Sequence, residues 1–190
     1  NFTFSAAEAI AQRLKVLKRA ITIGENSGGG AHITDQRVAT DRFCVFVPYG
    51  RSIGDPTKDT DWEGVGVVPD IRVPANEAFD KAYQIALSGL KASSKDTANT
   101  YQWYLDISLA KAKPIALNIQ DLEQYPGDYA DMKVRLNDGF LTYQKGTQMV
   151  YRLTPMKDDL FLIEGMPYMR LLFNRENGVI SSLIRLYDNG

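Results

Sequence analysis

The sequence contains few of the residues that most often define a disulfide-rich, metal-binding or histidine-dependent protein. It has one cysteine, Cys44, and one histidine, His32, among 190 residues. A single cysteine excludes an intrachain disulfide framework and a cysteine-rich zinc site. A single histidine leaves little choice of imidazole base. Asp55, Asp59 and Asp61 resemble a calcium loop only in part, since its glycine and final glutamate are out of place. No metal site and no cofactor are predicted.

The sequence also lacks an excess of charge of either sign. It holds 22 lysine and arginine residues against 23 aspartate and glutamate residues. This balance gives no electrostatic footprint for nucleic acid or for an anionic membrane surface. No apolar run approaches the roughly 18 residues that span a bilayer. Neither a nucleic-acid partner nor a membrane span is predicted.

What is present is an ordinary globular composition. Hydrophobic residues make up 44% and charged residues 24% of the chain, which excludes wholesale disorder. The first residue is Asn1 rather than Met, and helix-forming sequence follows almost at once. We therefore expect the sequence to be a piece of a longer protein.

Residues 1–92 alternate between helix and strand patterns. Residues 8–19 have apolar residues at helical spacing, preceded by Ser5 and Glu8 in the Ser-x-x-Glu arrangement of a capping box. Cys44 alternates with apolar neighbours and is expected to pack in the core. The further predicted elements are a short buried strand over 20–24, a glycine-rich loop over 24–32, a central strand over 42–50, an extended stretch over 65–74 and a helix over 75–90.

The pattern changes in the second half of the chain. A helix over 100–114 lies in a connector of residues 93–117, and alternation with period two begins near 118. Asn137-Asp138-Gly139 predicts a hairpin turn within 133–144, and further strand patterns follow at intervals of roughly ten residues. We predict an α/β region over 1–92 and a small antiparallel β barrel or sandwich over 118–190.

Three groups of residues are candidates for chemistry. Ser5 is either an ordinary helix cap or a nucleophile whose oxyanion the Ala6 N–H stabilises. A helix followed by a returning strand brings the Gly28, Gly29 and Gly30 loop near Ser5, where it suits a groove for an extended substrate backbone.

The other two candidates are single side chains in loops. His32 ends the glycine-rich loop and is either a surface residue or an alternative base close to Ser5. Glu63 follows Trp62 and precedes two glycines, and it is either a solvated loop acid or the carboxylate that orients a base.

These segments together resemble a known family. TFSAAEAIAQRLKVLKRAITIGENSGGGAH and FVPYGRSIGDPTKDTDWEGVGVVPDIRVPANEAFDKAYQIAL are similar to the tail-specific (carboxyl-terminal processing) serine proteases. The closest branch looks like the one with interphotoreceptor retinoid-binding protein and the tricorn core. The resemblance covers residues 2–90 and implies the C-terminal half of a ClpP/crotonase-type β/α superhelix.

The family resemblance implies roles for individual residues. Ser5 matches the nucleophile, Ala6 the oxyanion donor, and Glu63 in DWEGVGVVPD the orienting glutamate. One branch has a lysine base at the position of Gly30, so this sequence departs from that serine/lysine dyad. In the tricorn-like branch the histidine comes from an upstream segment, which here precedes Asn1, and His32 is not its assigned base.

The resemblance also implies a function and a compartment. The leading hypothesis is a serine endopeptidase fragment that cleaves extended or unfolded polypeptide and lacks its base without the N-terminal half of the catalytic domain. The alternative is a non-catalytic protein that binds an apolar ligand or peptide on the same scaffold. Exposed sheet edges suggest a homodimer. Bacterial members are exported, which implies a periplasmic, cell-surface or secreted location. The β module resembles barrel domains appended to bacterial hydrolases, beginning at QYPGDYA.

Overall fold

A computed structural model describes residues 2–51, 61–93 and 99–189. The chain forms two compact units, Asn1–Ala82 and Tyr83–Gly190, which divide within helix α2 (Ala78–Ser93). Each unit is described by itself. The mixed helix and strand content confirms the predicted α/β class, whereas the boundaries predicted at 92 and 117 stay a prediction.

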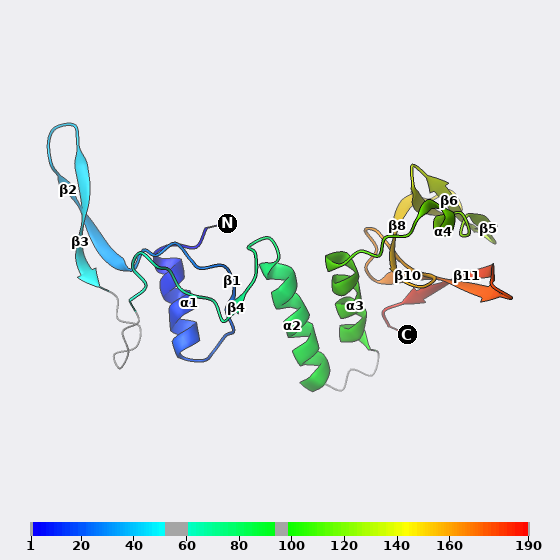
Figure 1. Cartoon of the computed structure of the whole chain (residues 1–190), viewed down its shortest axis with the longest axis horizontal. Helices are drawn as coiled ribbons and strands as arrows, with labels where there is room; N and C mark the ends of the chain where they lie inside the picture. Colours follow the sequence, from blue (N-terminus) through cyan, green and yellow to red (C-terminus); the bar gives the residue numbers. More distant parts are fainter. Residues whose placement is uncertain (1, 52–60, 94–98, 190) are drawn as a thin grey trace. The chain divides into compact units, whose positions relative to one another are not determined.

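The first unit is built around one helix and two small sheets (Figure 1). Helix α1 (Ala6–Val16) follows Ser5 and ends where Lys18 takes a left-handed conformation with φ 52°. Strands β1 (Ile23–Gly24) and β4 (Ile71–Arg72) pair in parallel. Strands β2 (His32–Val38) and β3 (Cys44–Arg51) pair antiparallel as a hairpin. Asp55 and Asp59, which were compared with a calcium loop, lie outside the described residues.

The prediction of a central, buried strand over 42–50 is wrong. Within the described residues β3 pairs only with β2, and nearly every side chain of both strands is exposed. Cys44 is likewise exposed rather than packed in a core. An apolar strand pattern indicates that a face is suited to burial, but it does not identify the element that covers it.

The apolar residues of α1 are also largely exposed. Ile10, Leu14 and Leu17 keep 64%, 39% and 55% of their surface accessible. The buried residue of this helix is Glu8, at 0% exposure. The helix is therefore fixed to its unit by this carboxylate and by Ala9 and Ala11, which pack against the buried cluster of Ala31, Trp62 and Val67, rather than by its larger apolar residues.

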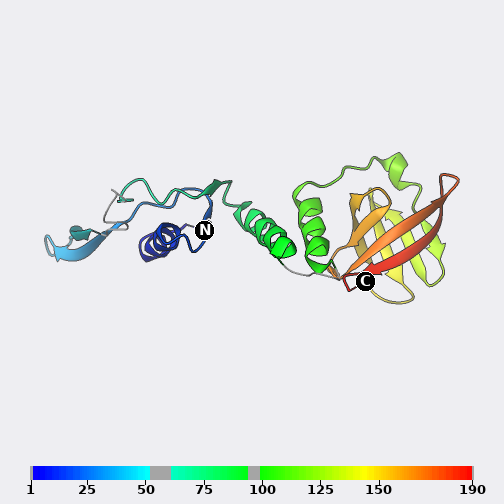
Figure 2. The same cartoon turned by 90° about the horizontal axis from the view of Figure 1, so that it is seen from below.

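The second unit contains a nearly closed, barrel-like antiparallel sheet, which confirms the predicted β module (Figure 2). Its seven strands lie in sequence order, each beside the next. They are β5 (Gly127–Tyr129), β6 (Met132–Asn137), β7 (Phe140–Lys145), β8 (Tyr151–Lys157), β9 (Leu160–Ile163), β10 (Met169–Glu176) and β11 (Val179–Tyr187). The β6–β7 turn has Asp138 at φ 47° and Gly139 at φ 80°, as the predicted Asp-Gly hairpin requires.

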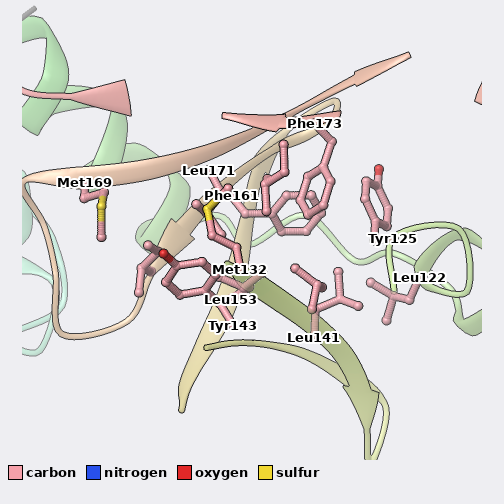
Figure 3. Close-up of a cluster of buried hydrophobic side chains, with 13 residues drawn as sticks. Leu122, Tyr125, Met132, Leu141, Tyr143, Leu153, Phe161, Met169, Leu171 and Phe173 are labelled. Atoms are coloured by element: carbon pink, nitrogen blue, oxygen red, sulfur yellow. The ribbon is translucent and has the colours of Figure 1, made fainter. Parts of the chain in front are cut away.

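The strands of this unit enclose an aromatic and aliphatic core (Figure 3). The ring of Tyr125 packs edge-on against Phe161 and Phe173, with centroids 4.9 Å from each. Such edge-to-face pairs add to the stabilisation from area burial alone. The packing of these rings therefore stabilises the curved form of the sheet that encloses them.

Two helices of the second unit precede the sheet. Helix α3 (Thr100–Ala112) confirms the predicted helix, and Trp103 donates a hydrogen bond from Nε1 to the carbonyl of Pro167 at 2.7 Å. Helix α4 (Ile119–Leu122) corrects the expectation of purely β structure from 118. Asn118 caps it by accepting a hydrogen bond from the Asp121 N–H at 2.8 Å. No helix in the described ranges has the length and apolar character to span a membrane.

Candidate active site

Ser5 occupies a strained position at the start of α1. Its backbone has φ 55° and ψ −123°, a combination that residues other than glycine rarely adopt. Its side chain is exposed, and Ser5 and Glu8 form a capping box in which the Glu8 carboxylate accepts the Ser5 backbone N–H. Ala6 is the first residue of α1, where a helix leaves the N–H without an internal partner. The Ser5 hydroxyl and the Ala6 N–H are therefore both available where the helix dipole favours negative charge.

The buried carboxylate of Glu8 organises the backbone around Ser5. Its Oε2 accepts hydrogen bonds from the N–H groups of Ser5 at 2.8 Å and Gly30 at 2.7 Å. Its Oε1 accepts from the Ser27 hydroxyl at 2.5 Å and the Gly29 N–H at 2.7 Å. Burial raises the pKa of Glu8, but the hydrogen bonds from Ser27, Gly29, Gly30 and Ser5 outweigh it, so the net pKa is lowered. Glu8 is thus an ionised residue that joins the helix start to the glycine-rich loop.

The glycine-rich loop makes close contacts inside the unit. The Gly28 N–H donates to the Thr3 carbonyl at 2.9 Å, and the Gly64 N–H donates to the Gly29 carbonyl at 2.8 Å. A Cβ on Gly29, where φ is 83°, would lie 2.9 Å from the Gly64 backbone. These contacts explain the need for glycine at this position. The predicted role of Gly28, Gly29 and Gly30 as a substrate groove stays a prediction.

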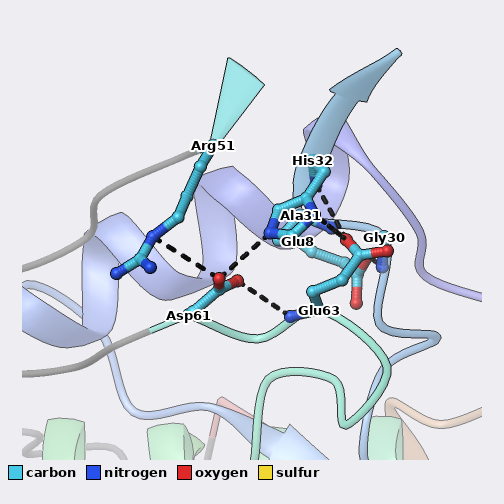
Figure 4. Close-up of polar contacts among 7 residues, drawn as sticks. All are labelled: Glu8, Gly30, Ala31, His32, Arg51, Asp61 and Glu63. Atoms are coloured by element: carbon cyan, nitrogen blue, oxygen red, sulfur yellow. Dashed lines mark hydrogen bonds and ion pairs between the residues drawn. The ribbon is translucent and has the colours of Figure 1, made fainter. Parts of the chain in front are cut away.

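Glu63 and His32 lie together on the other side of the loop (Figure 4). Oε2 of Glu63 accepts hydrogen bonds from the N–H groups of Ala31 at 2.6 Å and His32 at 2.8 Å. The His32 ring lies between two carboxylates, with Nε2 3.0 Å from Asp61 Oδ2 and Nδ1 3.9 Å from Glu63 Oε2. Arg51 Nε is 3.5 Å from the same Asp61 oxygen. The His32 hydrogen bond lowers the pKa of Asp61, assisted by the Glu63 N–H.

The structure brings some predicted residues together and leaves others apart. Ser5 and Gly30 share the carboxylate of Glu8, and Gly30 precedes the two N–H groups held by Glu63. Among the described residues, Ser5 shares no hydrogen bond or ion pair with His32 or Glu63. The contacts therefore run from Ser5 to Glu63 through the loop backbone.

Sequence reasoning missed two members of this site. Glu8 was assigned only a capping role, and Asp61 was considered only as part of a calcium loop. The partners of Glu8 lie 21 and 22 residues further along the chain, and Asp61 lies 29 residues from His32. The available signal was Glu8 itself, an acid three residues after a serine in a stretch of small residues.

A cavity of about 530 Å³ also belongs to the first unit. Its wall includes the apolar residues Phe2, Ile23, Val67 and Phe79 and the polar residues Thr3, Thr22, Glu25, Asn26 and Ser27. Ser27 connects it to the Glu8 network, since its hydroxyl donates to Glu8 and accepts from the Val67 N–H at 2.6 Å. Within the described residues no cluster of three or more His, Cys, Asp or Glu could hold a metal ion.

Comparison with known families matches the part of the chain that contains these contacts. Residues 1–73 match peptidase family S41. The S41 segment, residues 1–73, contains Ser5, Glu8, His32, Asp61 and Glu63, so all the polar contacts above lie inside the matched region. The match supports a relationship of this segment to the serine peptidases of the tail-specific protease family. No solved structure matches the chain.

Proposed function

We propose that this protein is a serine endopeptidase that cleaves extended or unfolded polypeptide tails through an acyl-enzyme on Ser5. We also propose that the protein belongs to the tricorn-like and retinoid-binding-protein-like branch, and that residues 1–92 form the C-terminal half of a ClpP/crotonase-like β/α superhelix. It also includes a periplasmic, cell-surface or secreted location. The S41 match supports the reaction class, and the geometry of Ser5 supports the assignment of the nucleophile.

The backbone of Ser5 is the observation that carries the proposal. A serine that only caps a helix would use its hydroxyl to accept a backbone N–H, with extended φ and ψ. Ser5 instead has φ 55° and ψ −123°, a sharp turn rather than the extended conformation of an ordinary cap, and its side chain is exposed. Strained, positive-φ serines on a sharp turn into a helix are the arrangement that exposes a nucleophilic Oγ. Strain of this kind persists where the surroundings fix it, and Glu8 supplies that constraint.

In the proposed reaction the Ser5 Oγ attacks the peptide carbonyl carbon and transfers its proton to a base. The Ala6 N–H stabilises the resulting oxyanion. The intermediate collapses with loss of the amine to leave an acyl-enzyme, which water then hydrolyses. A serine hydroxyl needs a base to attack at neutral pH.

A group outside the described residues best fits the role of that base. Both ring nitrogens of His32 face carboxylates, Asp61 and Glu63, rather than Ser5. We therefore propose a histidine from another segment of the protein, with Glu63 as the acid that orients it. His32 is the alternative base if its ring turns away from Asp61.

Reaction with a fluorophosphonate probe tests the nucleophile. The native protein and the 190-residue chain are each labelled, and the modified peptide is mapped by mass spectrometry. Labelling at Ser5 in the native protein alone would support a base from another segment. Labelling in both would support His32 or a second copy as the source of the base.

The variants Ser5→Ala and Glu63→Gln sharpen the test. Ser5→Ala should abolish labelling and peptide cleavage, and Glu63→Gln should lower cleavage by orders of magnitude. Glu77→Gln, at an exposed glutamate outside the site, is the matched control. Cleavage that survives Ser5→Ala would reject the proposed nucleophile.

The alternative function is non-catalytic binding of an apolar ligand or peptide. The 530 Å³ cavity favours it, because Phe2, Ile23, Val67 and Phe79 give it an apolar wall. Two results together would favour this alternative over the peptidase. The folded native protein would show no fluorophosphonate labelling, and it would bind an apolar fluorescent probe whose binding is lost in the Val67→Lys variant.

A further inference from the structure

The β2–β3 hairpin carries strand edges that the described chain leaves open. Strand β2 pairs only with β3 among the described residues. Every β2 residue after His32 is exposed, and Val38 keeps 76% of its surface accessible. An isolated two-stranded hairpin is marginally stable in water, and an unpaired edge is a template for a further strand. The hairpin therefore has the character of an element that pairs with another chain.

The two edges of the hairpin differ in their capacity to pair. Strand β3 contains Pro48, which has no N–H to donate to a ladder. Strand β2, HITDQRV, contains no proline. The edge of β2 is therefore the one with a full set of backbone donors and acceptors.

Symmetry limits how β2 can pair with a second β2. Hydrogen-bonded and non-hydrogen-bonded residue pairs alternate along antiparallel strands. A two-fold axis must therefore pass between two copies of the same residue. If it passed between neighbouring residues, it would relate a hydrogen-bonded pair to a non-hydrogen-bonded pair, and these two cannot be equivalent. Thr34, Asp35, Gln36 and Arg37 are the candidate central residues of the exposed strand.

Charge then favours one of these four registers, since a centre at Thr34 places Asp35 opposite the apolar Ile33. A centre at Asp35 places two aspartates opposite each other, and a centre at Arg37 does the same with two arginines. A centre at Gln36 instead places each Asp35 opposite an Arg37 of the other copy. Within one chain these two side chains already share a face, 3.0 Å apart, and they keep 52% and 67% of their surface exposed. In this register they form an alternating cluster of four charges across the two-fold axis.

We propose that β2 is a homodimerisation edge, pairing antiparallel with β2 of a second copy in the register centred on Gln36. The product is a four-stranded sheet in the order β3–β2–β2–β3. Thr34 faces Val38 of the second copy, which covers part of that exposed side chain. A sheet of this size satisfies the requirement for more than two strands that the hairpin alone does not meet.

Charge reversal in the native protein tests this pairing. Asp35→Arg and Arg37→Asp should each weaken dimerisation about fivefold or more, measured by sedimentation velocity over a concentration series, because like charges then face each other. An equimolar mixture of the two variants should dimerise again. The intrachain Asp35–Arg37 pair is broken in both variants, so recovery reports only the contact between copies. A mixture that stays monomeric, or single variants that dimerise normally, would overturn the proposal.

Disulfide trapping tests the register independently of charge. In a Cys44→Ser background, Gln36→Cys should form an intermolecular disulfide under mild oxidation, because the two residues face each other across the axis. Phe46→Cys is the control, since Phe46 pairs with Gln36 inside the hairpin. Two copies of Phe46 would lie about 14 Å apart, three strand spacings, and should not cross-link. Cross-linking of Phe46→Cys instead, or a monomeric protein whose β2 edge resists hydrogen exchange, would assign the edge to another partner.

Discussion

The backbone N–H of Ser5 donates a hydrogen bond to Oε2 of Glu8 at 2.8 Å, and the same oxygen accepts the Gly30 N–H at 2.7 Å. One buried carboxylate oxygen therefore holds the proposed nucleophile and the glycine-rich loop together. Four donors converge on the whole carboxylate, which offsets the cost of burying its charge.

Replacement of Glu8 by Gln should lower stability by about 2–4 kcal/mol. An amide has one acceptor oxygen and would direct an NH₂ group at two donors. The measurement is urea unfolding, with Glu77→Gln as a control in which the side chain is exposed. Ser5 labelling should fall together with stability. A Glu8→Gln protein as stable as the Glu77→Gln protein would show that the four hydrogen bonds do not stabilise the fold.

Two substitutions of Ser5 should separate its strain from its chemistry. Glycine adopts positive φ without a Cβ clash, whereas alanine retains the strain of φ 55°. Ser5→Gly should therefore be more stable than Ser5→Ala by about 1 kcal/mol. Both should lose probe labelling completely. Equal unfolding midpoints for the two variants would mean that the Ser5 backbone relaxes in solution.

Gly66 and Gly64 form a matched pair for measuring the cost of the close contact between Gly66 and the Ser27 backbone. Both have positive φ, 77° and 71°, so alanine is strained at either position. A Cβ on Gly66 would lie 2.1 Å from the Ser27 carbonyl oxygen, whereas one on Gly64 meets nothing within 4 Å. Gly66→Ala should cost about 2 kcal/mol more than Gly64→Ala, measured by thermal unfolding. A smaller penalty at Gly66 would mean that the Ser27 backbone moves freely.

Asp70 should make the first unit sensitive to acid. Hydrogen bonds from the backbone N–H and hydroxyl of Thr22 lower its pKa from 3.8 to about 2, and Lys15 lies 3.2 Å away. A carboxyl with a lowered folded-state pKa stabilises the protein fully above the unfolded pKa of 3.8, and this contribution is lost as the pH falls through about 2. Asp70→Asn should therefore be less stable at neutral pH and show a flatter decline between these values.

Urea unfolding at a series of pH values measures this effect. Asp41→Asn, at an exposed aspartate of the hairpin turn, should retain the wild-type decline. An Asp70→Asn curve parallel to that of the Asp41→Asn protein would exclude Asp70 as the source of the acid sensitivity.

Arg170 should be the charged residue most important to the second unit. Its guanidinium lies 3.7 Å from the centre of the Trp103 ring and 3.6 Å from Asp106, with only 5% of the residue exposed. Burial lowers its pKa, and Asp106 opposes that shift. Arg170→Ala should cost about 3 kcal/mol, because it removes a buried cation and leaves Asp106 unpaired.

Arg152 provides the exposed comparison. It lies 4.3 Å from the Phe140 ring and 3.6 Å from Glu164, with over half of its side chain accessible. Arg152→Ala should therefore cost less than about 1 kcal/mol. Equal losses for the two arginine variants, in the same thermal unfolding assay, would contradict the assigned importance of burial.

Local patterns predicted much of the second unit. The Asp138-Gly139 turn can be read from two adjacent residues, because only small or polar residues tolerate its positive φ. The helix after Ser5 was also predicted from local signals, the Ser-x-x-Glu pattern and the helical spacing of apolar residues. The polar sequence of β2, in contrast, gave no strand signal. The contacts of Glu8 with Gly29 and Gly30, and of Asp61 with His32, join residues more than twenty positions apart. Periodicity does not identify such partners, since it records only which face of an element is apolar.

The contacts of Arg170 define the smallest segment in which the barrel can fold outside this protein. Its guanidinium donates to the Trp103 carbonyl and pairs with Asp106, both on α3, while its Nε is buried without a hydrogen-bond partner in the described structure, and Trp103 in turn donates to Pro167. A barrel excised at β5 would carry an unpaired cation at the place of the missing helix. The smallest piece that can move intact between proteins therefore begins at Thr100, and α3 belongs to the barrel as a unit of exchange.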